Sequence, residues 1–160
     1  LGRPSVPIGI GNKREPVWPP GISGSISHSH GICVSMATLD SEAMVGVDIE
    51  KIEPGAVIEI ILKRALDTLE RELIADREQC DGRVLPFLVF SAKETLFKAL
   101  YPVVGRHFDF RAARLFERPD RNELRLELTR PLHRSLPAGR RFLIRFSVTG
   151  SFVRTWLVCR

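Results

Sequence analysis

The chain has 160 residues and a mass of 18.0 kDa, a length that suits one domain or two small lobes. Hydrophobic residues make up 44% of the chain and charged residues 27%, values close to the globular average, which exclude a disordered or collagen-like protein. No apolar run reaches the roughly 20 residues of a membrane span, so we expect no stable association with a membrane.

The basic residues are concentrated at the C-terminal end of the chain. The net charge is +5, but residues 1–105 hold 11 Lys and Arg against 14 Asp and Glu, whereas residues 106–160 hold 13 Arg against 5 Asp and Glu. Such a segment indicates an anionic partner, namely a phosphate, a nucleic acid or an acidic protein. A solvated strand surface that happens to use arginine is an equally good explanation.

The three cysteines, Cys33, Cys80 and Cys159, are odd in number and lie far apart. This pattern argues against a disulfide framework or a Cys-rich zinc site and is typical of a reducing compartment, so we predict a cytoplasmic protein. The chain shows no signal peptide and opens with Leu1 rather than methionine, so we expect a fragment of something longer.

The first part of the chain predicts loops followed by strands. Residues 1–20 are rich in Gly and Pro and are expected to be extended and loop-like. Residues 24–29 and 31–39 predict a β-hairpin with Gly31 at the break between them, and a third strand is expected over residues 44–49.

Helices are expected next. The apolar spacing after Pro54 and Gly55 predicts one helix, and residues 66–78 predict a second, with Asp67 or Thr68 as its N-terminal cap. Residues 85–104 form the longest helical segment, which the following glycine ends.

The chain then returns to strands, which are predicted over residues 112–116, 123–129, 142–148 and 152–158. Within the second of these, apolar and charged residues alternate, so one face is expected to be buried and the other wet. Strands, then helices, then strands again predict an α+β fold with an antiparallel sheet.

Asp48 and Glu50 lie two residues apart near the end of the third predicted strand, so both carboxylates project from the same face. At about 5 Å they repel by roughly 3 kcal/mol where the effective dielectric constant is about 20. Such a pair sits in water, gains a cation or raises one pKa. Mg²⁺ prefers oxygen ligands of this kind, and the alternative is an exposed strand end with two ordinary charges.

Glu94 and Lys98 lie four residues apart on the long predicted helix, so they share one face and can form an ion pair. Most of the remaining helix is apolar, which is typical of a buried helix, and buried charges need partners or a metal. The alternative is a simple ion pair at the surface.

Residues 25–30 contain three serines together with His28 and His30, next to Gly24 and Gly31. Hydroxyl and imidazole groups beside exposed backbone amides suit phosphate binding. There are two alternatives for this segment. His28 and His30 could be half of a metal site, or they could be ordinary structural histidines.

Taken together, these segments resemble the 4′-phosphopantetheinyl transferases, in particular the surfactin-type class and its enterobactin synthetase component D branch. The matching motifs are WPPG at residues 18–21, GSISHS at 24–29, GVDIE at 46–50 and FSAKETLFK at 90–98. The resemblance extends over most of the chain, from about Pro16 to Phe146.

The resemblance implies two similar α+β lobes with antiparallel sheets packed by helices, and an active site in the cleft between them. Residues 1–40 are expected to be the remnant of a first lobe whose front is truncated in this chain. Residues 41–160 are expected to form the second lobe, which carries the metal site and the catalytic helix.

The resemblance also assigns roles to the charged residues of the second lobe. Asp48, Glu50 and Glu94 match magnesium-binding carboxylates, and Glu94 matches the general base as well. Lys98 matches a catalytic lysine that stabilises charge on the pyrophosphate or protonates the leaving group.

Contacts to the phosphates of coenzyme A are implied for a second group of residues. His28 matches a phosphate-contacting histidine with Ser27 beside it, and Lys93 and Lys98 are expected to contact phosphate from the long helix. Glu70 matches a further acidic residue of some members only loosely.

The implied reaction is the Mg²⁺-dependent transfer of 4′-phosphopantetheine from coenzyme A to a serine of an apo acyl or peptidyl carrier protein, with release of 3′,5′-ADP. The implied protein is a monomer without a nucleic-acid partner, and it serves siderophore, nonribosomal peptide or polyketide biosynthesis. Two alternatives stay open, a magnesium-dependent nuclease or phosphodiesterase and a truncated, inactive relative that only binds coenzyme A or a carrier protein.

Overall fold

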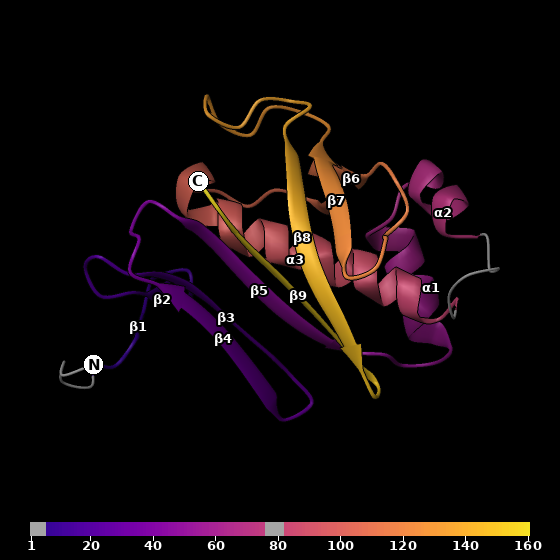
Figure 1. Ribbon diagram of the computed structural model, residues 1–160, viewed down its shortest axis with the longest axis horizontal. Helices are drawn as coiled ribbons and strands as arrows, with labels where there is room; N and C mark the ends of the chain where they lie inside the picture. The colour runs from indigo at the N-terminus through magenta and orange to yellow at the C-terminus, as the bar shows by residue number, and fades with distance from the viewer. Residues whose placement is uncertain (1–5, 76–81) are drawn as a thin grey trace.

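The computed structural model describes residues 6–75 and 82–160, and it is an α+β fold with antiparallel sheets, as predicted (Figure 1). The elements are, in chain order, β1 (Gly9–Ile10), β2 (Pro16–Val17), β3 (Ser23–Ser29), β4 (Ile32–Thr38), β5 (Met44–Lys51), α1 (Ala56–Arg64), α2 (Thr68–Ala75), α3 (Val84–Val104), the short 3-10 turn η1 (Phe110–Ala112), β6 (Ala113–Leu115), β7 (Glu123–Leu128), β8 (Arg141–Thr149) and β9 (Phe152–Cys159).

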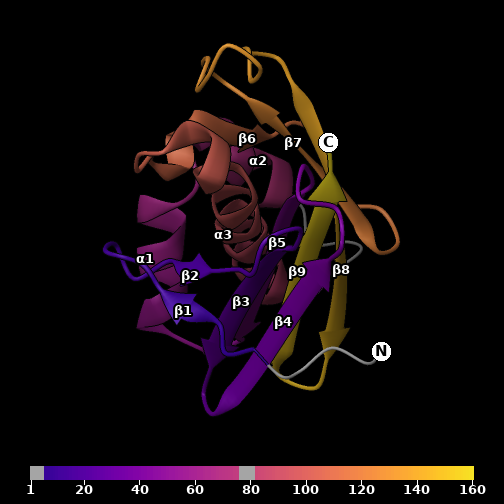
Figure 2. The same cartoon turned by 90° about the vertical axis from the view of Figure 1, so that its left-hand side faces the viewer.

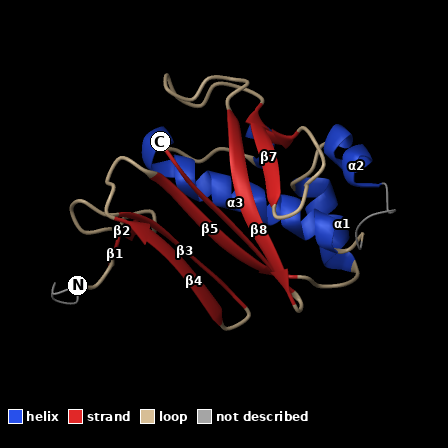
Figure 3. Ribbon diagram, viewed as in Figure 1, coloured by secondary structure: helices blue, strands red, loops and turns tan. Residues whose placement is uncertain are grey.

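The largest sheet has the strand order β5-β9-β8-β7-β6, and every neighbouring pair in it is antiparallel. The long helix α3 packs against β5 and β9, so helices and sheet form two layers (Figure 3). Because β5 is the first strand of this sheet, one of its edges has no partner within the sheet, and that edge becomes important for the site.

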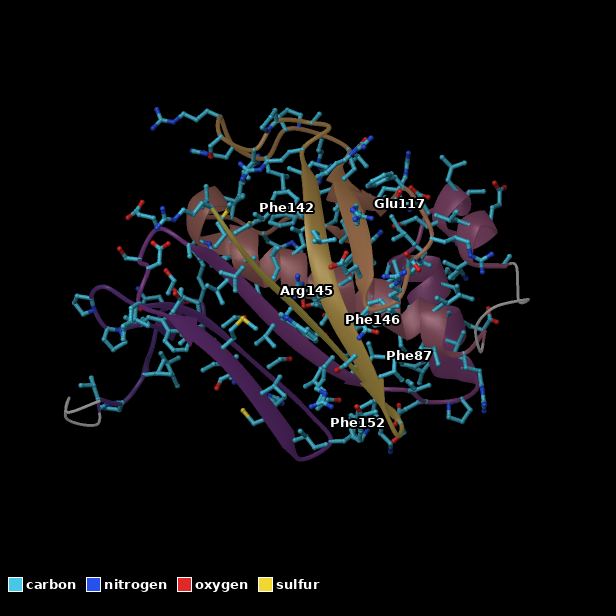
Figure 4. The ribbon with its side chains drawn as sticks, viewed as in Figure 1. Phe87, Glu117, Phe142, Arg145, Phe146 and Phe152 are labelled. Atoms are coloured by element: carbon cyan, nitrogen blue, oxygen red, sulfur yellow. The ribbon has the colours of Figure 1, made fainter. Side chains whose placement is uncertain are left out.

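The core lies between α3 and the sheet, as the alternating pattern of the strands predicts. The apolar residues of β7, Leu124, Leu126 and Leu128, are at most 1% exposed. On β8, Phe142 is buried, whereas Arg145 points its side chain to the opposite, exposed face (Figure 4). The sequence therefore specifies which face of each strand meets the helices.

Two helix ends agree with the expected signals. The Asp67 carboxylate accepts a hydrogen bond from the Glu70 backbone N–H, and the Glu70 carboxylate accepts one from the Asp67 N–H, which is a capping box. Helix α3 ends at Gly105, which adopts a left-handed conformation with a φ of 68°. The predicted end of the second helix, residues 76–78, and Cys80 lie outside the described residues.

The hairpin formed by β3 and β4 is a separate two-stranded sheet that packs against β5 (Figure 2). At the unpaired edge of β5, the Val47 backbone N–H donates a hydrogen bond to Ser25 Oγ at 3.1 Å. A serine side chain thus satisfies an edge donor that a neighbouring strand would otherwise take. The predicted division into lobes at residue 40 stays a prediction. In the described part of the chain, no helix combines the length and hydropathy required to cross a membrane.

Gly46 allows α3 to approach β5 closely, since a Cβ at this position would overlap with the Thr95 carbonyl oxygen. Replacing Gly46 with alanine should lower the free energy of unfolding by about 1–3 kcal/mol, because a backbone carbonyl is less able to move than a side chain. Urea unfolding measures the change. Gly9→Ala, where a Cβ lies 3.4 Å from the nearest atom, is the matched control, and equal stability of the two variants would contradict the close approach.

Candidate functional site

Asp48 lies at the centre of the candidate site, on β5 and facing α3. Its side chain is 3% exposed, and both carboxylate oxygens accept hydrogen bonds. Oδ1 accepts from Ser27 Oγ and from Lys98 Nζ, each at 2.7 Å, and Oδ2 accepts from Ser91 Oγ at 2.7 Å. The carboxylate is therefore held from both sides by donors of β3 and α3.

Regular secondary structure brings these residues together. Alternation along β5 turns Gly46, Asp48 and Glu50 toward the helix, as predicted for the two carboxylates. At about 100° per residue along α3, the remaining members of the site fall within one arc of roughly 100°. These members of the helix face are Ser91, Glu94, Thr95 and Lys98.

Glu50 and Glu94 carry charges that their surroundings disfavour. Burial, together with the nearby charges of Asp48 and Glu94, raises the pKa of Glu50 to about 7. Burial and the charge of Asp48 also raise the pKa of Glu94, although Lys98 and His107 oppose this shift. The three carboxylates thus lie close enough to repel one another, and Lys98 offsets only part of their charge.

This surplus of negative charge and the hard oxygen donors fit a divalent cation such as Mg²⁺. Asp48, Glu50 and Glu94 are the residues that would hold it. Within residues 6–75 and 82–160, however, no three His, Cys, Asp or Glu side chains form a ready-made metal site. The donor chemistry therefore fits the metal, whereas the carboxylates are not already gathered at ligand distances.

Lys98 reaches across to the strand rather than along its own helix. Its ammonium group donates to Asp48 Oδ1 at 2.7 Å and to the Val47 carbonyl at 3.3 Å. The spacing of Glu94 and Lys98 permits an ion pair, but the Lys98 ammonium pairs with Asp48 instead. Of the two carboxylates, Asp48 is more buried than Glu94. It therefore needs a charged partner more, and the Lys98 ammonium is that partner.

Lys93 lies on the other side of α3, away from Asp48. It is 3% exposed, and its ammonium donates to Glu70 Oε2 and to the Ala65 carbonyl, each at 2.7 Å. Burial lowers the pKa of Lys93, and the charge of Glu70 opposes the shift. Sequence analysis grouped Lys93 with the phosphate contacts, whereas the structure places it in a buried ion pair.

Ser27 and His28 face opposite sides of β3, because neighbouring strand residues alternate. Ser27 is buried against Asp48, whereas His28 is exposed and lies directly across the hairpin from Cys33. Of Ser27 and His28, the structure therefore brings only Ser27 to the carboxylate cluster.

A mostly apolar pocket of about 380 Å³ opens beside Glu50. Val57 and Ile60 of α1 line it together with Phe87 (Figure 4) and Phe90 of α3. Burial against such apolar neighbours is the first cause of the raised pKa of Glu50.

Sequence reasoning did not single out several residues that contact the cluster. Ser91 donates to Asp48, Thr155 of β9 lies 2.9 Å from Ser91, and Thr95 lies 2.6 Å from Thr155. These hydroxyl-bearing residues interrupt the apolar positions of α3 and β9, and such a break in a buried element is the signal that could have revealed them.

Several arginines of the C-terminal segment form ion pairs with nearby carboxylates. Arg125 pairs with Glu117 at 2.7 Å, and Arg141 pairs with Glu127 at 2.7 Å. These pairs agree with a solvated strand surface for this part of the segment.

Two family models match the chain. The model of the 4′-phosphopantetheinyl transferase superfamily matches residues 44–147, which include every carboxylate of the cluster. The model of the 4′-phosphopantetheinyl transferase N-terminal domain matches residues 1–38, which include Ser27.

Curated relatives agree with these models. Enterobactin synthase component D of Salmonella typhi is 41% identical over 105 residues, which cover 62% of this chain and 40% of the relative. The 4′-phosphopantetheinyl transferase Svp of Streptomyces mobaraensis is 35% identical, covering 75% of this chain and 49% of the relative. The 4′-phosphopantetheinyl transferase PptT of Mycobacterium tuberculosis is 33% identical, covering 72% and 50%. The chain therefore spans half or less of the length of these relatives.

Proposed function

Because this chain belongs to the 4′-phosphopantetheinyl transferase superfamily, we propose that it transfers the 4′-phosphopantetheine group of coenzyme A to a serine of an apo acyl or peptidyl carrier protein. The observation that carries the proposal is the convergence of Asp48, Glu50 and Glu94 around Lys98 at the junction of β5 and α3. Carboxylates and a lysine are the groups that a phosphoryl-type transfer requires, since such a reaction depends on charge neutralisation and alignment.

In this reaction the serine hydroxyl attacks the phosphorus that carries pantetheine. A new oxygen–phosphorus bond forms, the bond to the bridging oxygen breaks, and 3′,5′-ADP leaves with that oxygen. When bound by Asp48, Glu50 and Glu94, Mg²⁺ supplies positive charge that offsets the negative charge of the diphosphate.

Glu94 takes the proton of the attacking serine. Without a cation, burial and the neighbouring Asp48 raise the pKa of Glu94, so the protein surroundings of this carboxylate favour the uptake of a proton. Lys98, whose ammonium lies beside Asp48, offsets the charge that grows on the departing phosphate. Both residues occupy one face of a rigid helix, which supports their acting on the same substrate.

The residues expected to contact coenzyme A lie in different places. Ser27 lies at the cluster and supports a contact to the substrate there. For His28 and Lys93 the expected phosphate contacts stay predictions, as do the monomeric state and the cytoplasmic location.

One assay tests the function. The chain is incubated with coenzyme A, Mg²⁺ and an apo carrier protein, and the carrier is weighed by mass spectrometry. We expect a gain of one phosphopantetheine mass that EDTA abolishes. Cleavage of nucleic acid without a change in the carrier would instead indicate a nuclease, and binding of coenzyme A alone would indicate an inactive relative.

The affinity for Mg²⁺ should depend on pH. Glu50, whose pKa is raised to about 7, must lose its proton before it can bind a cation, so a rise in pH favours binding. We expect the affinity to increase about tenfold from about pH 6 to about pH 8, as measured by isothermal titration calorimetry. Glu50→Gln has no proton to lose at this position, so a variant that kept the full pH dependence would contradict the assignment.

A further inference from the structure

Three hydroxyl groups form a continuous chain behind Asp48. Ser91 Oγ lies 2.7 Å from Asp48 Oδ2, Thr155 Oγ1 lies 2.9 Å from Ser91 Oγ, and Thr95 Oγ1 lies 2.6 Å from Thr155 Oγ1. All three residues are 0% exposed. This hydroxyl chain therefore connects α3 with β9 and ends on the Asp48 carboxylate.

Each hydroxyl has a single hydrogen, and this fixes the direction of the chain. An ionised Asp48 only accepts, so Ser91 must donate to it. The hydrogen of the next bond then has to come from Thr155, and the hydrogen of the last from Thr95. The additional contact of Thr95 Oγ1 with the Thr155 carbonyl, at 3.2 Å, is the longer of its two bonds and shares the same hydrogen.

The hydroxyl chain donates a hydrogen bond to Oδ2 of Asp48, whereas other groups donate to Oδ1. Ser27 and Lys98 both donate to Oδ1, so Asp48 has donors on each of its oxygens. For Glu50 and Glu94, the interactions found among the described residues are longer-range ones with nearby charges, including Lys98, rather than hydrogen bonds. Asp48 is thus fixed, whereas the other two carboxylates are able to adjust.

We propose that Ser91, supported by Thr155 and Thr95, is a positioning residue that holds the Asp48 carboxylate in the orientation needed to bind the divalent cation. Glu50 and Glu94 would supply the other carboxylates that hold the cation. The inference rests on the proposed function only through the cation, since it concerns the orientation of one ligand.

The test measures binding of Mn²⁺, used as a probe for Mg²⁺, by the decrease of the free Mn²⁺ signal in electron paramagnetic resonance. Groups that orient a ligand typically contribute about 10- to 100-fold to metal affinity. We expect Ser91→Ala to bind Mn²⁺ about 10- to 100-fold more weakly than the wild type. Thr155→Val, which keeps the Ser91 donor but removes its support, should lose less.

Thr155→Ser is the matched control because it keeps the hydroxyl that Val removes, and it should bind Mn²⁺ like the wild type. A merely structural role would lower the thermal unfolding temperature of Ser91→Ala and leave its Mn²⁺ affinity unchanged, which would overturn the proposal. A wild-type chain that binds no Mn²⁺ would overturn it as well.

The carrier assay separates this inference from the proposed function. If the wild type binds Mn²⁺ and Ser91→Ala binds it weakly, but no carrier is modified, the positioning role stands and the transfer function fails. If carriers are modified while Ser91→Ala retains full affinity, the function stands and the positioning role fails.

Discussion

The Lys93→Met variant should unfold with a free energy about 3–5 kcal/mol below that of the wild type. Lys93 and Glu70 form an ion pair with 2% and 0% of their side chains exposed. Without the lysine, the Glu70 carboxylate remains buried with no cation beside it. Removal of one partner of a buried pair is costly for this reason, even where the intact pair adds little to stability.

The position of Glu70 increases the expected loss. Its Oε1 accepts from the Leu115 backbone N–H at 2.8 Å, and its Oε2 accepts from the Asp67 N–H at 2.9 Å and from Lys93. The carboxylate therefore joins the start of α2, the helix α3 and the strand β6. If Glu70 turned toward water to recover its solvation, both backbone N–H groups would lose their acceptor. Any other position of the side chain therefore costs free energy as well.

Urea unfolding measures the effect, with Lys51→Met as the matched control. Lys51 forms a 3.9 Å pair with Glu53, and the two side chains are 38% and 34% exposed. A pair in contact with water contributes about 0–1 kcal/mol, so the control should be nearly neutral. Adding Glu70→Gln to Lys93→Met removes the uncompensated charge and should restore part of the stability. Equal losses for Lys93→Met and Lys51→Met would show that the buried pair has no special role.

The position of Lys93 could have been predicted from its spacing along the helix. At about 100° per residue, Lys93 lies roughly 200° from Ser91, on the opposite side of the helix, whereas Lys98 returns to within about 20° of it. The motif treats Lys93 and Lys98 alike and predicts a phosphate contact for both, which for Lys93 stays a prediction. Helical periodicity is local information and separates them.

The fold was largely predictable for the same reason. Alternation in β7, the capping signal at Asp67 and the glycine after α3 are local features, and the structure confirms all three. The partners of the site residues were not predictable in this way. Lys98 could pair along the helix with Glu94 or across to Asp48, and the choice depends on how α3 packs against β5.

The hydroxyl chain illustrates the limit of sequence reasoning. Ser91 and Thr155 are 64 residues apart and meet only because β9 lies next to β5 beneath α3. A buried serine in a helix indicates that a partner exists, but not which one. Motifs identified the carboxylates, whereas the groups that orient them depend on tertiary packing.

Replacing Glu94 with glutamine should lower the rate of carrier modification at least about 100-fold at saturating Mg²⁺, because the variant loses the proposed base. Glutamine has nearly the same shape but cannot take the serine proton. The fold should remain intact, since burial and the charge of Asp48 already disfavour the ionised form of Glu94. We expect the thermal unfolding temperature of the metal-free variant to equal or exceed that of the wild type.

The pH dependence of the rate, measured with Mg²⁺ saturating at every pH so that metal binding does not limit it, distinguishes a base from a residue that only shapes the site. Glu94 has to be deprotonated to act, so the wild-type rate should increase with pH over the range in which Glu94 loses its proton. In Glu94→Gln this rise should be absent. Glu72→Gln, which changes an exposed glutamate on α2, is the matched control and should keep both the rate and the profile. If Glu94→Gln retains more than about a tenth of the wild-type rate, another group takes the proton and the role assigned to Glu94 is wrong.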